Sequence, residues 1–208
     1  MEMVLDLYEQ PYDPKRPVVC LDERPGQLLS EVYQPTALAP GKARRQDFEY
    51  KREGTFNIFM MVEPLRGWRL ANVTQQRTAM DFANQLGQLE KEYPDADEIV
   101  LVSDNLNTHK LENLWKVFEP AEALRLSKRF RMVHTPKHGS WLNMAEIELS
   151  AMDKQCLGRT RYETCEAVSA RVEPWNKARN EQRVKIRWSF TVEKARDKFQ
   201  RHYRSELS

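Results

Sequence analysis

The chain has 208 residues, 40 % of them hydrophobic, which suffices for one domain with an appendage or for two small domains. Its 33 basic and 31 acidic residues give a net charge of only +2, so overall charge excludes a strongly polycationic or polyanionic protein and says nothing about partners. Three cysteines without a Cys-x-x-Cys pair, no signal peptide and no apolar run of membrane length are typical of a soluble cytoplasmic protein with free thiols.

The first acidic motif follows a short apolar run. Residues 1–15 are polar, contain two prolines, and are expected to pack loosely. The run from Pro17 to Leu21 predicts a strand that ends at the acidic pair Asp22 and Glu23. Side chains alternate along a strand, so these two acids point to opposite faces and only one can join a shared site. The sequence pattern leaves that choice open.

The next segment lacks regular periodicity. Residues 34–47 carry two prolines, a glycine and three basic side chains, which predicts a loop that is either solvated or closes on a polyanion. Two strand-like runs follow at 48–52 and 55–62. Glu53-Gly54 connects them in the manner of a hairpin.

A change of period then predicts a helix between two strands. A short strand is expected at 70–73, and apolar residues at spacings of three and four predict an amphipathic helix over 74–93. The run Ile99 to Ser103 predicts a buried strand that ends at Asp104. Strand, helix and strand in this order are typical of a mixed α/β sheet.

Beyond Asp104 the pattern predicts two more elements. A turn leads into a helix with an apolar face from Leu111 to Phe118, which we expect to end at Pro120, while 121–127 add a further helical turn or two. A short strand is predicted at 130–134.

A helix follows the turn at Gly139 and Ser140, with an apolar stripe from Leu142 to Cys156. At 100° per residue, Glu146 and Glu148 lie on opposite shoulders of that stripe, so only one of them can face a shared site. Helix geometry does not choose between them.

The C-terminal part is basic. A helix is expected at 159–172, and Lys and Arg are dense over 177–204, interleaved with Trp188 and Phe190. Because aromatic residues accompany the cations, we interpret this segment as a contact for nucleic-acid phosphates, made by Arg183, Lys185 and Arg187.

Two strand-end aspartates and a helical glutamate are the ligands that a two-metal phosphoryl-transfer site needs. Mg²⁺ prefers oxygen ligands, and two ions about 4 Å apart can activate the attacking oxygen and stabilise the leaving oxygen. Without metal, three crowded carboxylates would repel one another.

Three segments together closely resemble the catalytic domain of DDE transposases, most closely the six-thirty type of bacterial insertion sequences in the mariner-like superfamily. The resemblance extends to Arg179-Asn180 and to residues 188–191. The three segments are Val-Val-Cys-Leu-Asp22-Glu, Leu-Val-Ser-Asp104-Asn-Leu-Asn-Thr-His, and Thr-Pro-Lys-His-Gly-Ser-Trp-Leu-Asn-Met-Ala-Glu146-Ile-Glu.

The resemblance implies an RNase H-like α/β fold of the retroviral integrase superfamily, a mixed five-stranded sheet flanked by helices with the first and fourth strands adjacent. It also implies that Asp22 rather than Glu23, Asp104, and Glu146 rather than Glu148 are the catalytic residues and hold two Mg²⁺ ions, for which Mn²⁺ can substitute. The implied reaction is metal-dependent cleavage at transposon ends, followed by transfer of the freed strand into target DNA.

Further residues near the triad are candidates for DNA contact. Asn105 and His109 either orient a scissile phosphate or a metal-bound water, or serve the turn and the helix cap. Lys137, His138 and Trp141 are expected to contact the DNA backbone or stack on a base.

We expect residues 1–158 to form the catalytic core and residues 159–208 a basic helical extension packed on it. The chain starts almost at the first catalytic strand, so a separately encoded helix-turn-helix half is expected to read the transposon ends. Dimerisation is expected from the resemblance, with the 34–47 loop as a clamp, and no membrane partner is expected. The alternatives are an inactive remnant that only binds DNA or dimerises, and a general RNase H-like nuclease.

Overall fold

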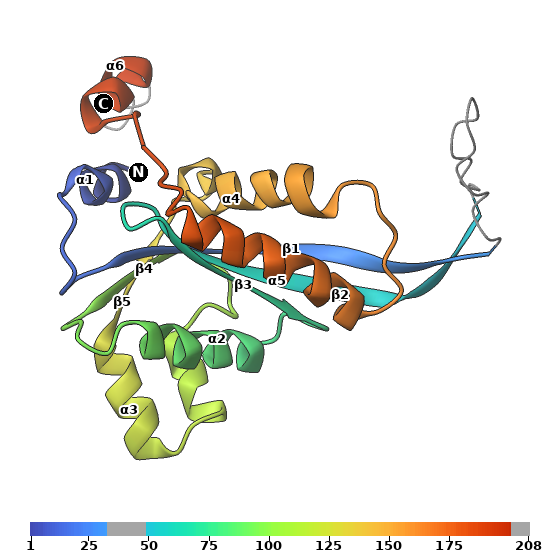
Figure 1. Ribbon diagram of the computed structural model, residues 1–208. Helices are drawn as coiled ribbons and strands as arrows, with labels where there is room; N and C mark the ends of the chain where they lie inside the picture. The colour runs from blue at the N-terminus through green and yellow to red at the C-terminus, as the bar shows by residue number, and fades with distance from the viewer. Residues whose placement is uncertain (33–48, 201–208) are drawn as a thin grey trace.

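A five-stranded sheet with helices on both faces forms the centre of the protein (Figure 1). This computed structural model describes residues 1–32 and 49–200. The strands are β1 (Val18–Glu31), β2 (Tyr50–Glu63), β3 (Trp68–Thr74), β4 (Ile99–Ser103) and β5 (Phe130–His134), in the sheet order β3-β2-β1-β4-β5. The pairs β1–β2 and β2–β3 are antiparallel, and β1–β4 and β4–β5 are parallel. The predicted mixed sheet is therefore confirmed.

Helices cover both faces of the sheet. The α-helices are α1 (Glu2–Glu9), α2 (Ala79–Glu92), α3 (Pro120–Arg129), α4 (Ala145–Met152), α5 (Cys165–Glu181) and α6 (Val192–Lys198). Shorter turns are η1 (Leu111–Lys116), η2 (Ser140–Leu142) and the π-helical η3 (Asp153–Leu157). Figure 1 shows α4 and α5 on one side of the sheet and α2 and α3 on the other.

The alternation of side chains along β1 and β4 creates two apolar cores. Cys20 and Val102 point into the core beneath α4 and α5, whereas Leu21 and Leu101 point into the core beneath α2 and α3. Every residue of β4 is buried, because the strand is central and covered on both faces. The continuous apolar run of β4 in the sequence has this cause.

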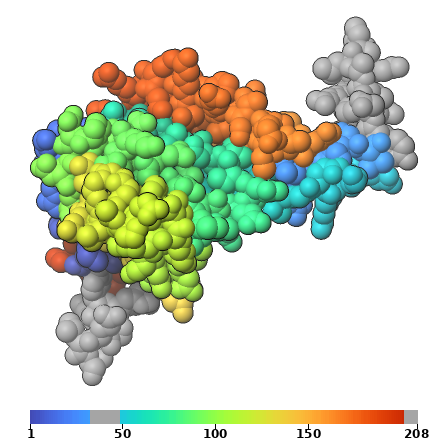
Figure 2. Space-filling view, turned by 90° about the horizontal axis from the view of Figure 1, so that it is seen from below, coloured from blue at the N-terminus to red at the C-terminus, as the bar shows by residue number. Residues whose placement is uncertain are grey.

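The predicted hairpin at Glu53-Gly54 is wrong. The runs on either side belong to one strand, β2, which pairs with β1 along its whole length. The register shifts between Leu28 and Leu29, opposite Gly54, whose φ of 145° is accessible mainly to glycine. Gly54 therefore marks a bulge, and the far ends of β1 and β2 stand out from the body as a two-stranded arm (Figure 2). The predicted loop at 34–47 lies outside the described residues.

The N-terminal segment does not pack loosely, as the sequence had suggested. Residues Val4, Leu5 and Leu7 of α1 are buried against the core on the α4 side. On its other flank α1 contacts α6, where Arg196 forms an ion pair with Glu2 at 2.8 Å. The helical periodicity of these residues is short, and the two prolines that follow obscured it.

Other predicted boundaries change at capping residues. Thr78 and Asp81 form a capping box, so α2 begins later than the predicted residue 74. Pro120 does not end a helix but opens α3, where a missing N–H costs nothing. Thr164 caps α5, which therefore starts later than the predicted helix at 159–172. The helix also continues beyond the predicted end, to Glu181.

A buried ion-pair network joins α5 to β3 and α4. Arg69 on β3 and Glu148 on α4 are both 0 % exposed, with Nε and Oε1 3.0 Å apart. Arg179 on α5 donates from Nη2 to Oε2 of Glu148 at 3.0 Å. Asn180 exchanges two hydrogen bonds with the backbone of Arg69, at 2.8 and 2.7 Å. Arg179 and Asn180, near the start of the basic segment, are therefore partly buried and fixed to the body of the protein.

None of the helices within residues 1–32 and 49–200 has the length and apolar character needed to cross a membrane.

Candidate active site

The register of two parallel strands brings the predicted aspartates together. The last paired residues of β1 and β4 are Cys20 and Val102, and Asp22 and Asp104 each lie two positions farther along. Parallel strands keep a constant offset, so the two carboxylates lie on neighbouring strands where the ladder between them ends. The expectation that the first and fourth strands are adjacent is confirmed.

The acidic pair at this point divides between the faces of the sheet. Asp22 interacts electrostatically with Glu146 at the start of α4. Glu23 instead bonds His109, whose ring packs on Phe82 of α2 at 4.9 Å. The alternation expected along the strand is therefore observed, and Asp22 is the member of the pair that lies near Glu146.

The position of Glu146 depends on Asn143, a residue that the sequence analysis did not single out. Asn143 is 2 % exposed, donates from Nδ2 to the carbonyl oxygen of Leu21 at 2.8 Å, and accepts at Oδ1 from the N–H of Ala145 at 3.2 Å. It therefore joins the first turn of α4 to β1 immediately before Asp22. An asparagine directly ahead of a predicted helix is the sequence signal that could have identified it.

The other candidate glutamate, Glu148, points away from the aspartates. Its side chain is fully buried between Arg69 and Arg179. Glu146 is partly exposed and has no side-chain hydrogen bond or ion pair among the described residues. The two glutamates therefore lie on opposite shoulders of α4, as the helical period predicts.

The proton affinity of Asp22 is raised first by burial and second by the neighbouring carboxylates. Burial, together with the negative charges of Glu146, Asp104 and Glu23, raises the pKa of Asp22 to about 6. The backbone N–H of Glu23 opposes this by donating to Asp22 Oδ1 at 2.8 Å. The three predicted catalytic carboxylates thus form one electrostatic group.

Behind Asp104 lies a buried histidine held between two acids. His109 Nε2 is 2.7 Å from Glu23 Oε1, and Nδ1 is 2.6 Å from Asp104 Oδ1. Burial lowers the pKa of His109, but the hydrogen bond and charge of Glu23 and the charge of Asp104 outweigh this and raise it. The ring is 1 % exposed, so we revise the predicted DNA contact of His109, whereas Asn105 beside it is exposed.

The donor set suits a hard divalent cation. Asp22 Oδ1 accepts a hydrogen bond from the N–H of Glu23. Asp104 Oδ1 is buried 2.6 Å from His109 Nδ1, an ion-pair contact without hydrogen-bond geometry, and the same nitrogen lies 3.3 Å from the Asp104 carbonyl oxygen. Oδ2 of each aspartate is without a hydrogen bond among the described residues. Oxygen donors of this kind are those that Mg²⁺ prefers. Among residues 1–32 and 49–200, however, no group of three or more His, Cys, Asp or Glu is already spaced to hold a metal ion. In the absence of a cation, mutual repulsion opposes a closer approach of the three carboxylates.

Three of the predicted DNA-contacting residues gather in one hollow. Lys137, His138 and Trp141 line a space of about 590 Å³ together with residues 1–3 and Phe199. A turn closed by the Gly139 N–H and the Pro136 carbonyl at 2.8 Å puts Lys137 and His138 at its tip. His138 has a φ of 63°, unusual for a residue other than glycine. Trp141 is 42 % exposed and meets Phe190 edge-on at 5.5 Å.

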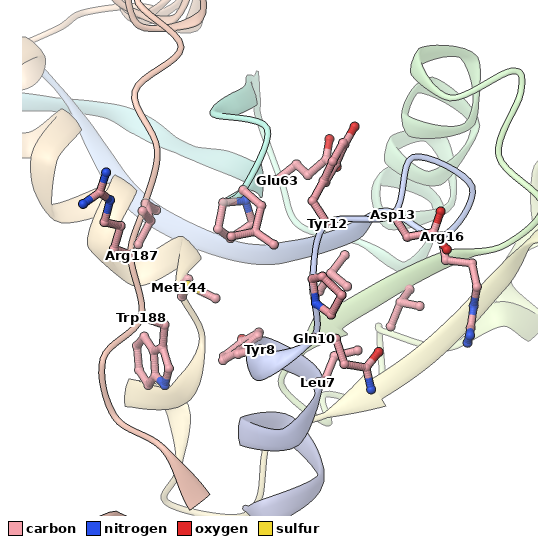
Figure 3. A pocket seen from close by; sticks show the side chains of 16 residues that line it. Leu7, Tyr8, Gln10, Tyr12, Asp13, Arg16, Glu63, Met144, Arg187 and Trp188 are labelled. Atoms are coloured by element: carbon pink, nitrogen blue, oxygen red, sulfur yellow. The ribbon is translucent and has the colours of Figure 1, made fainter.

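The predicted DNA-contacting residues of the basic C-terminal segment lie elsewhere on the surface. Arg183, Lys185 and Arg187 are exposed on the segment between α5 and α6. Arg183 lies against Gly67 in the β2–β3 turn. Arg187 lines a cavity of about 270 Å³. Figure 3 shows Arg187 and Trp188 on one side of this cavity and Tyr12 on the other.

Comparison with known proteins adds to this geometry. A family model described as DDE superfamily endonuclease matches residues 17–169. No curated protein matches the sequence.

Three solved structures share the fold. They are the Mos1 mariner paired end complex with Mn (15 % identity, TM-score 0.59, 88 % of this chain and 54 % of that chain), the Mos1 strand transfer complex (15 %, 0.58, 88 % and 54 %) and a pre-cleavage Mos1 transpososome (14 %, 0.55, 90 % and 61 %). The shared fold is RNase H-like, and this chain spans about half the length of the solved proteins.

Proposed function

The chain belongs to the DDE superfamily of endonucleases, and from this membership we propose that it is the catalytic domain of a mariner-like transposase. It cleaves DNA at the ends of a mobile element and transfers the freed strand into target DNA. The six-thirty type of bacterial insertion sequence is the specific group that we assign it to, on the three sequence segments around Asp22, Asp104 and Glu146.

One observation carries the proposal. The carboxylate of Asp22 is coupled to those of Asp104 and Glu146, although the three residues come from β1, from the end of β4 and from α4. The pKa of Asp22 is raised first by burial and then by the charges of Glu146, Asp104 and Glu23, so the three acids are close enough to repel one another. Such a convergence of like charges supports a site that is completed by divalent cations.

We assign the binding of two Mg²⁺ or Mn²⁺ ions to Asp22, Asp104 and Glu146. The chemistry that such ions supply when bound is activation of the attacking oxygen and stabilisation of the leaving oxygen. Asp22 is positioned by a hydrogen bond from the Glu23 N–H, Asp104 by ion-pair contact with His109, and the helix that carries Glu146 by the hydrogen bond from Asn143 to the Leu21 carbonyl oxygen.

DNA binding is assigned to two surfaces. Lys137, His138, Trp141 and the exposed Asn105 lie next to the carboxylates in sequence or at the same end of the strands, which suits contact with the reacting end. Arg183, Lys185 and Arg187 supply phosphate contacts farther along the duplex.

The organisation of the chain is also a proposal. We assign residues 1–158 to the catalytic core and 159–208 to an extension, and the buried contacts of Arg179 and Asn180 support an extension fixed to the core rather than tethered to it. We further propose a homodimer that acts with a separate helix-turn-helix part, which would read the transposon ends.

A nicking assay tests the proposed function. DNA that carries the ends of the element is incubated with the protein and Mg²⁺ or Mn²⁺. The expected result is metal-dependent nicking that disappears in Asp104→Asn, while Asp97→Asn, an exposed acid outside the site, keeps it.

Two results would contradict the proposal. Nicking that persists in Asp104→Asn would place the chemistry elsewhere. A wild-type protein that binds DNA but never nicks it, with either metal, would identify an inactive remnant. Cleavage of an RNA–DNA hybrid in preference to DNA would instead indicate a general RNase H-like nuclease.

A further inference from the structure

We propose that Glu23 and His109 are positioning residues for Asp104: together they hold its Oδ1 and thereby direct its Oδ2 toward the bound cation. This inference rests on the proposed function and deepens it. It gives the second acid of the Asp22-Glu23 pair a role of its own.

The contacts form one continuous path from the interior to the site. Glu23 Oε1 lies 2.7 Å from His109 Nε2, and His109 Nδ1 lies 2.6 Å from Asp104 Oδ1. The side chains are 3 %, 1 % and 39 % exposed, in that order. The path therefore starts at a buried carboxylate and ends at the exposed carboxylate that is the candidate ligand.

The imidazole ring is fixed in place from several sides. Its face packs on Phe82, with ring centres 4.9 Å apart. Its backbone N–H donates to the Leu106 carbonyl at 2.9 Å, which closes the turn between Asp104 and His109. These contacts restrain the His109 ring, so the ring fixes the position of the Asp104 carboxylate rather than the reverse.

Nothing else among the described residues uses these polar groups. The only side-chain partner of Glu23 there is His109, and the ring of His109 contacts only Glu23 and Asp104 through its nitrogens. A buried carboxylate is costly unless it is paired, and Glu23 is paired with His109. Among the described residues, the one further polar partner of the His109 ring is Asp104, which indicates that the pair acts on Asp104.

Glu23 thereby orients both aspartates. Its backbone N–H donates to Asp22 Oδ1 at 2.8 Å, and its side chain acts on Asp104 Oδ1 through His109. In Asp22 one oxygen accepts a hydrogen bond, in Asp104 one oxygen is in ion-pair contact, and the second oxygen of each has no hydrogen bond among the described residues and would be available to a cation. Hydrogen-bonded support of this kind is general for carboxylates that bind metals, and its loss typically weakens metal binding 10- to 100-fold.

Two substitutions at one position separate positioning from packing. The amide nitrogen of asparagine takes the place of histidine Nδ1, and that of glutamine takes the place of Nε2. His109→Asn therefore keeps a donor toward Asp104, whereas His109→Gln keeps only the donor toward Glu23. Both remove the ring and its contact with Phe82.

The experiment is a titration of the full chain with Mn²⁺, followed by electron paramagnetic resonance, without DNA. We expect His109→Gln to bind Mn²⁺ at least about tenfold more weakly than wild type, and His109→Asn to stay closer to wild type. Thermal unfolding of both variants is recorded alongside, because a merely structural role would lower both stabilities without producing this order of affinities.

The outcomes distinguish the inference from the proposed function. A wild-type protein that binds no Mn²⁺, or binds it as well after Asp104→Asn, refutes the metal site itself. Specific binding by wild type with equal affinities for the two His109 variants overturns the positioning role alone. If both variants fail to fold, Glu23→Gln and Glu23→Leu replace them. Glutamine still pairs with the ring and should retain binding, leucine should lose it, and equal affinities for these two would overturn the inference.

Discussion

Asn143 donates a hydrogen bond from Nδ2 to the carbonyl oxygen of Leu21, over 2.8 Å, and so joins the helix that carries Glu146 to the strand that carries Asp22. Replacing Asn143 with alanine leaves this buried carbonyl without a partner. We expect a loss of about 1–3 kcal/mol in the free energy of unfolding, measured by urea denaturation. Asn107→Ala, the same change on the exposed turn after Asp104, should cost less than about 0.5 kcal/mol. Equal losses would show that the Leu21 contact contributes nothing.

The two glutamates of α4 should separate stability from activity. Glu148→Gln removes the charge between buried Arg69 and Arg179, and we expect it to destabilise the fold by about 3–5 kcal/mol. Glu146→Gln should change stability by less than about 0.5 kcal/mol, since its side chain has no hydrogen bond or ion pair with residues 1–32 or 49–200, yet abolish metal-dependent nicking. Chemical denaturation and the nicking assay, run on both variants, check this. A stable, inactive Glu148→Gln would reverse the assignment.

The carboxylate cluster should make stability depend on pH in the absence of divalent cations. The pKa of Asp22 is about 6 in the folded protein against an ordinary value of 3.8, so the folded state binds the proton more tightly. Stability from this group is complete below pH 3.8 and is lost as the pH rises through 6. At pH 8, Asp22→Asn should therefore be more stable than wild type by about 1–2 kcal/mol, after allowance for solvent screening.

The same comparison contains its own control. Below pH 4 the advantage of Asp22→Asn should vanish, because wild-type Asp22 is then protonated in both states. Asp97→Asn, at an exposed position, should follow wild type at every pH. Thermal melts in chelator from about pH 3 to pH 8 measure both variants, and a constant difference across that range would contradict the coupling.

The hollow around Trp141 should show two kinds of DNA contact. Lys137→Ala should lower the slope of log affinity against log salt by about 0.9, as expected for the loss of one phosphate contact. Trp141→Ala should weaken binding of single-stranded DNA by about 1–3 kcal/mol through lost stacking. Lys116→Ala, an exposed lysine on η1 outside this hollow, should leave the slope unchanged. Fluorescence anisotropy at several salt concentrations provides the measurement.

Patterns local in sequence predicted the sheet and the positions of its acids. The run that became β4 is apolar because both faces of that strand are covered, and Asp104 follows it where the ladder ends. The amphipathic period likewise predicted α2. Short-range reasoning failed at Gly54, because a glycine beside a charged residue looks the same in a turn and in a bulge.

The support of the site depends on contacts that no local pattern contains. Glu23 and His109 are 86 positions apart in the chain, and the sequence alone allowed His109 to be read as a surface residue. Glu148 finds Arg179 on a different helix, 31 positions away. The partners of such buried charges can be identified only from the fold. The alternation along β1 and the period of α4, by contrast, were sufficient to show that one member of each acidic pair faces the site.

The arm formed by β1 and β2 gives a single strand two different environments. Val18 and Val19 pair with β4, Cys20 pairs with both β4 and β2, and Ser30 and Glu31 pair with β2 alone. A two-stranded ribbon is marginally stable by itself, and local opening governs how quickly its amide protons are replaced by deuterium. Along β1, in which Pro25 has no amide proton, the lifetimes of these protons should therefore fall from those of the most protected core to those of a surface turn, and tracing that decline would locate where the body of the molecule ends.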